Sequence, residues 1–160
     1  ENFDLIEQYP LQDWNGGHVR VIRPNILYMP HGEMYTIDGR LIFTLGGGDD
    51  VFLDIDDSDS DDIRSLPTLE ELEKAYLRLE KVDFKVDYIF THDCSSKLKG
   101  FLDLNAHDGS VHINYLNTFF EALYDRAEFK HWYFGAYHID KVIPPRCTAV
   151  YKNIVPVDAV

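Results

Sequence analysis

The chain has 160 residues, the length of one domain, and we expect residues 1–160 to form a single domain. It carries 15 Lys and Arg against 28 Asp and Glu, a net charge of −13, and 45% of its residues are apolar. That apolar share is enough for a core and excludes a disordered acidic tail. The negative charge would repel a nucleic-acid backbone or an anionic membrane, so neither is expected as a direct partner.

Nothing in the sequence indicates a membrane-spanning or secreted protein. No run approaches the roughly 20 apolar residues that span a bilayer, and the first residues have neither the basic nor the apolar segment of a signal peptide. The two cysteines, Cys94 and Cys147, allow one disulfide, but two thiols fit a reducing compartment equally well. We favour free thiols and a cytoplasmic protein.

The first half of the chain predicts strands and one hairpin. Residues 19–30 read as strand material interrupted by proline. Residues 34–37 and 41–45 are rich in β-branched and aromatic side chains, and they are joined across Asp38-Gly39. This dipeptide favours a type I′ turn, so these two runs are expected to pair as an antiparallel hairpin.

An acidic segment follows, with eight aspartates among the fourteen residues 49–62. Like charges repel and carboxylates desolvate poorly, so an exposed loop is expected. A calcium-binding EF-hand is excluded, because Asp59 stands where that loop needs Gly and Ser65 where it needs Glu.

The second half alternates helices and strands. Thr68 and Glu71 form a capping box that opens a helix with apolar residues at helical spacing. Strands are expected at 86–91 and 131–134, a long helix at 112–128, and one or two closing strands between 141 and 157. Strands separated by helices indicate an α/β sandwich.

Two histidines directly follow predicted strands and are the strongest candidates for chemistry. They are His92, after Thr91, and His138, at the end of Gly135-Ala136-Tyr137-His138. The carboxyl ends of strands line the ligand crevice of open α/β sheets, where an imidazole can bind a metal. Asp93 or Asp140 could fix the second ring nitrogen.

Other polar groups offer weaker alternatives. Cys94 lies two residues after His92, but a cysteine and a histidine so close on one turn seldom meet as nucleophile and base. His107, Asp108 and His112 are most simply loop and helix-capping residues.

From end to end, the chain resembles the C-terminal part of a calcineurin-like metallophosphoesterase. The opening residues look like those that follow Gly-Asn-His in that family's GNHE motif, and later segments fall in the family's order. The segments that carry the resemblance are Glu1-Asn2-Phe3-Asp4-Leu5-Ile6, Trp14-Asn15-Gly16-Gly17, the hairpin ending in Gly46-Gly47, Tyr88-Ile89-Phe90-Thr91-His92 and Trp132-Tyr133-Phe134-Gly135-Ala136-Tyr137-His138-Ile139-Asp140.

The resemblance implies a β-sandwich flanked by helices, here a truncated four-layer αββα arrangement, and a two-metal phosphoester hydrolase. His92 matches the family's lone histidine, a ligand of the second metal (Mn, Fe, Zn or Mg). His138 matches the last histidine of the GHxH motif, a ligand of the first metal. Ala136 replaces the first histidine of that motif, and the motifs that precede the GNHE residues are absent. Because two imidazoles cannot hold a dinuclear centre, this chain alone is expected to be inactive.

Two functional hypotheses remain open. The chain is either part of a metallophosphoesterase whose N-terminal segment is cut off or supplied by another chain, or a decayed member that acts as an acidic interaction or inhibitor protein. A basic protein partner, or mimicry of nucleic acid, would suit the second hypothesis. A domain without its first strands would expose sheet edges and apolar faces, so self-association is expected.

Overall fold

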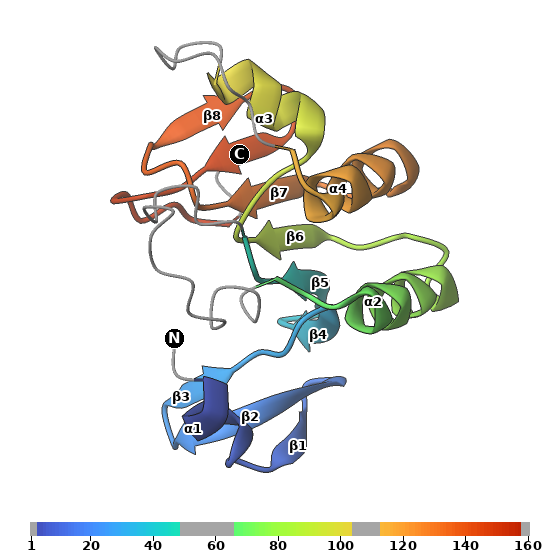
Figure 1. The fold of residues 1–160 in the computed structure, drawn as a ribbon, viewed down its shortest axis with the longest axis vertical. Coiled ribbons are helices and arrows are strands. Elements are labelled where there is room, and N and C mark those ends of the chain that lie inside the picture. The colour runs from blue at the N-terminus through green and yellow to red at the C-terminus, as the bar shows by residue number, and fades with distance from the viewer. Residues whose placement is uncertain (1–2, 49–65, 104–112, 158–160) are drawn as a thin grey trace, which may run out of the picture.

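The computed structural model describes residues 3–48, 66–103 and 113–157, which form a mixed α/β structure with two sheets (Figure 1). The smaller sheet is antiparallel, in the order β1-β2-β3. The short helix α1 is tied to it, because the Arg20 guanidinium donates to the carbonyls of Glu7 and Tyr9. The bounds of these elements are α1 Phe3–Glu7, β1 Leu11–Trp14, β2 Gly17–Arg23 and β3 Ile26–Tyr28.

The larger sheet has six strands in the order β4-β5-β6-β7-β9-β8. Its four central strands, β5, β6, β7 and β9, run parallel, and each outer strand is antiparallel to its neighbour. The parallel strands therefore all end at one edge of the sheet. The bounds are β4 Glu33–Ile37, β5 Arg40–Leu45, β6 Tyr88–Thr91, β7 His131–Phe134, β8 Lys141–Ile143 and β9 Cys147–Ala149.

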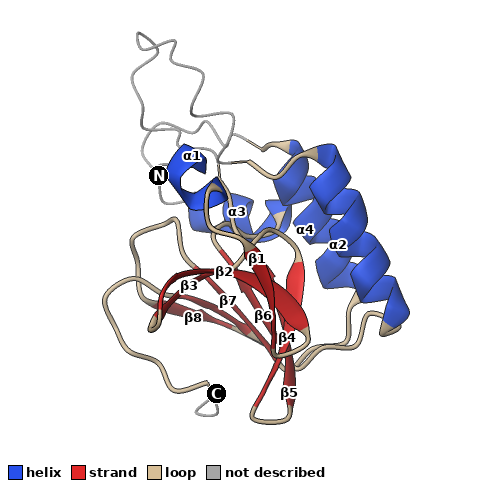
Figure 2. Ribbon diagram, turned by 90° about the horizontal axis from the view of Figure 1, so that it is seen from below, coloured by secondary structure: helices blue, strands red, loops and turns tan. Residues whose placement is uncertain are grey.

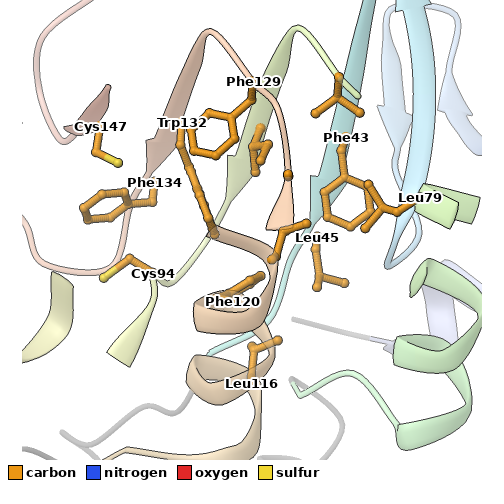
Figure 3. Close-up of a cluster of buried hydrophobic side chains, with 14 of the residues drawn as sticks. Phe43, Leu45, Leu79, Cys94, Leu116, Phe120, Phe129, Trp132, Phe134 and Cys147 are labelled. Carbon is orange, nitrogen blue, oxygen red and sulfur yellow. The ribbon is translucent and has the colours of Figure 1, made fainter. Parts of the chain in front are cut away.

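Three helices, α2 (Leu69–Lys81), α3 (Ser96–Asp103) and α4 (Tyr115–Arg126), lie on one side of the large sheet (Figure 2). The apolar core fills the space between these helices and the sheet. Trp132 of β7 lies near its centre, with its ring edge-on to Phe120 of α4 (Figure 3). Among the described residues, no helix is long and apolar enough to cross a membrane.

The small sheet is joined to β4 and α2 by polar contacts. The Thr36 amide donates to the Asn15 carbonyl at 2.7 Å. The buried Glu33 carboxylate accepts from the Arg78 guanidinium at 2.7 Å and faces the His18 ring at 3.4 Å. One carboxylate therefore connects β4, β2 and α2.

Several sequence predictions are confirmed. Asp38 and Gly39 both have positive φ, as a type I′ turn requires, and they join β4 to β5. The Thr68 capping box is present at the start of α2. The strands expected at 86–91 and 131–134 correspond to β6 and β7, the tail forms β8 and β9, and the expected 112–128 helix is the shorter α4.

Other features differ from the predictions or lie beyond what the structure describes. The elements α1, β1 and α3 were not predicted from the sequence. The acidic segment 49–62 and the cluster of His107, Asp108 and His112 lie outside the described residues.

Candidate functional site

The candidate site lies where β5, β6 and β7 end together. In the parallel register, Leu45 pairs with Thr91 and Thr91 with Phe134, so His92 and Gly135 each follow directly on adjacent strand ends. The His92 amide donates to the Leu45 carbonyl at 3.4 Å, and the Gly135 amide donates to the His92 carbonyl at 2.9 Å. The backbone of His92 is therefore held from both sides.

The His92 side chain is exposed at this edge and borders Gly48, in the segment that follows β5. A side chain at Gly48 would begin only 2.5 Å from Cδ2 of His92, a distance that real Cβ atoms do not tolerate. Because Gly48 has no side chain, the imidazole of His92 has space to lie beside it. Gly48 and His92 therefore lie side by side, although they are far apart in the sequence.

His138 lies in the loop that follows β7, also exposed, and this loop is locally strained. Ala136 (φ +62°) and His138 (φ +50°) both occupy the left-handed region that L-residues rarely adopt. The His138 ring lies 4.8 Å from the Tyr151 ring. Contacts from outside the loop must offset the cost of this backbone conformation.

Asp140 secures the chain segment against which His138 rests. Its carboxylate accepts hydrogen bonds from the amides of Tyr151, Lys152 and Asn153 at 2.9–3.2 Å. The amide of Tyr151 contributes most to holding the Asp140 pKa below its ordinary value. The carboxylate of Asp140 is thus engaged by backbone amides, and no described contact joins it to the second nitrogen of His138.

A buried polar cluster lies directly behind His92. The Asp93 carboxylate is 3% exposed and accepts from the Tyr137 hydroxyl, the Asn117 amide group and the Lys99 ammonium. Burial raises the pKa of the neighbouring Cys94 thiol, which stays protonated. Cys94 is also 0% exposed, and a buried thiol with a raised pKa is a poor nucleophile.

His131 belongs to the core rather than to the site. It is 4% exposed in β7, and its Nε2 lies 2.8 Å from the Thr148 hydroxyl. Burial lowers its pKa, so the ring is neutral at physiological pH.

The strain at Ala136 gives a testable prediction. Replacing Ala136 with Gly removes the left-handed penalty of about 1–2 kcal/mol, which exceeds the roughly 0.5–1 kcal/mol of extra chain entropy that glycine loses. We expect Ala136→Gly to raise the free energy of unfolding by about 0.5–1 kcal/mol in urea denaturation. The same substitution at Ala122, on the exposed surface of α4, should lower it by about 1 kcal/mol. Effects of the same sign at both positions would contradict the argument.

The described residues do not by themselves fit the dinuclear metal centre that the resemblance implies. Within residues 3–48, 66–103 and 113–157, no three His, Cys, Asp or Glu side chains gather into a group that could hold an ion. The site supplies two exposed imidazoles, and Ala136 offers no donor in the same loop. Any further ligands would have to come from outside the described residues.

Sequence reasoning placed His92 and His138 at one sheet edge but missed the side chains behind them. Tyr137 belongs to no motif that indicates a role for its hydroxyl. Asp93 was predicted only to hydrogen-bond the second nitrogen of an imidazole. Asn117 looked like an ordinary residue of an amphipathic helix. The only available hint was a cluster of polar residues, Asp93 to Ser96, between a buried strand and a helix.

Comparison of the chain with protein-family models, with curated proteins and with solved structures found no match.

Proposed function

We propose that this chain is part of a calcineurin-like metallophosphoesterase, and that His92 and His138 are two of its metal ligands. The observation that carries the proposal is the hydrogen bond from the Gly135 amide to the His92 carbonyl, 2.9 Å long. It brings the loop of His138 to the strand end that carries His92, and both imidazoles are exposed there. The sequence resemblance assigns the metal-ligand role to the same two residues.

We further propose that a second sheet covers the face of the large sheet opposite the helices, as in the sandwich that the resemblance implies. On that face, the rings of Phe90 and Tyr133 stack 5.2 Å apart. A hollow of about 270 Å³ lies beside them, bordered by Val155 and Val157 of the C-terminal segment. The C-terminal segment already covers Tyr133, which is 5% exposed and donates to the Val157 carbonyl, whereas Phe90 stays partly exposed beside the hollow and offers the surface against which another layer would pack.

The described residues alone would not hydrolyse a phosphoester on this proposal, because they hold two donors and no bridging carboxylate. The test therefore uses the protein as its source cell produces it, assayed with bis(p-nitrophenyl) phosphate and Mn²⁺. We expect His92→Ala and His138→Ala each to lower the rate at least about 100-fold, through loss of a metal ligand. His18→Ala, an exposed histidine on the small sheet, should leave the rate unchanged.

Ala136→His, which restores the missing donor, should raise the rate in the same assay. Rates in His92→Ala and His138→Ala equal to the unmodified protein would contradict the proposal. If no variant exceeds the background rate, the acidic interaction protein becomes the better description.

A further inference from the structure

The Asp93 carboxylate lies where four donors from different parts of the chain converge. Oδ1 accepts from the Cys94 amide and from the Tyr137 hydroxyl, both at 2.8 Å. Oδ2 accepts from Nδ2 of Asn117 at 2.7 Å and lies 3.5 Å from the Lys99 ammonium. Asp93 is the residue immediately after His92, and Tyr137 is the residue immediately before His138.

Two of these donors fix Asp93 to the helices. Lys99 comes from α3 and Asn117 from α4, and the side chains of Asp93, Lys99 and Asn117 are almost completely buried. Asn117 is itself held in place, since Nδ2 also donates to the Cys94 carbonyl and its Oδ1 accepts from the Asn114 amide in the capping box of α4. The position of the Asp93 side chain is therefore fixed by α3 and α4 and does not depend on Tyr137.

Tyr137, in contrast, belongs to a loop whose own backbone conformation is unfavourable. Ala136 and His138 on either side of it have positive φ. The Tyr137 ring packs edge-on against Phe134 at 5.9 Å, which aims its hydroxyl at Asp93.

We propose that Asp93 is a positioning residue that, through Tyr137, fixes the loop of His138 relative to His92. The inference rests on the proposed function, because a fixed spacing between the two imidazoles matters only if both serve one site. A charge-assisted hydrogen bond is well suited to this task, since it is stronger and shorter than a neutral one. The contact of His138 with Tyr151 and the amides bound by Asp140 support the outer side of the same loop.

The test compares two variants that each remove one tyrosine hydroxyl from the 160-residue chain. Tyr137→Phe removes the donor to Asp93, while the matched control Tyr133→Phe removes a donor to the Val157 carbonyl (3.1 Å). Tyr137→Phe also removes the acceptor of the Cys94 thiol (3.5 Å), and the bond it loses to Asp93 is charge-assisted, so its urea midpoint should fall somewhat more than that of Tyr133→Phe. Backbone ¹⁵N relaxation and the ¹H–¹³C imidazole signals, recorded without metal, report the order of the loop and the surroundings of the two histidines.

In Tyr137→Phe, we expect the order parameters of the amides at 136–139 to fall from about 0.85 to below about 0.6. The imidazole signals of both His92 and His138 should shift. Tyr133→Phe should leave these amides and both signals as in the unmodified chain.

A loop that stays ordered in Tyr137→Phe, with unmoved histidine signals, would overturn the inference. So would equal loosening of the loop in Tyr133→Phe, because the effect would then reflect general loss of stability. These measurements contain no metal and no substrate. Failure of the proposed function, seen as hydrolysis that does not depend on His92 and His138, is therefore a separate result.

Discussion

Replacing Trp132 with Ala should lower the free energy of unfolding by about 3–5 kcal/mol, the range for deleting a fully buried large aromatic side chain. The indole is 0% exposed and lies edge-on to Phe120 (5.6 Å) and Phe129 (5.8 Å), so a truncation leaves a cavity that the surrounding rings cannot fill. Its Nε1 also donates to the Thr91 hydroxyl at 2.7 Å, and this hydrogen bond at the end of β6 would be lost. Urea denaturation followed by circular dichroism measures the change.

The same substitution at Trp14 is the matched control. Trp14 is half-buried in the small sheet, where its ring lies 5.5 Å from that of Tyr35, so less apolar surface returns to water. We expect Trp14→Ala to cost about 1–2 kcal/mol. A loss at Trp132 no larger than at Trp14 would mean that Trp132 is not the centre of the core.

The elements with strong local causes were predictable from the sequence. The Asp38-Gly39 turn and the Thr68 capping box act within a few residues, so the hairpin and the start of α2 follow from local chemistry. The helix α3 was not predicted. Its first turn is held partly by Glu121 of α4, whose carboxylate accepts from the Lys97 amide at 3.0 Å, and that contact exists only after the chain has folded.

In the candidate site too, some features follow from the local sequence, whereas others depend on how distant elements pack. Alternation of strands and helices predicts that residues after parallel strands meet at one edge, and His92 and the loop of His138 do so. The pairing of Asp93 with Lys99, Asn117 and Tyr137 depends on how α3 and α4 pack against the sheet. No spacing rule in one sequence identifies such partners, since they lie up to 44 positions apart.

Asp93→Asn should be strongly destabilising, by about 3–5 kcal/mol, because it leaves the Lys99 ammonium buried without an opposite charge. Both side chains are nearly inaccessible, at 8% for Lys99 and 4% for Asp93. Asp87→Asn is the matched control, since Asp87 pairs with Lys130 at 2.7 Å but Lys130 is 64% exposed. Water solvates that ammonium when its partner is lost, so a cost below about 1 kcal/mol is expected.

A double variant separates the charge from the shape of the Asp93 side chain. If the unpaired Lys99 charge causes the loss, then adding Lys99→Met to Asp93→Asn should restore a large part of it, because no ion remains buried. Raising the salt concentration should weaken the contribution of Asp87 and Lys130 much more than that of the buried pair. A double variant as unstable as the sum of the single variants would instead assign the loss to the hydrogen bonds of Asp93 with Asn117 and Tyr137. In that case the Asp93 carboxylate would hold α4 and the loop of His138 in place through these hydrogen bonds, and its negative charge would not contribute.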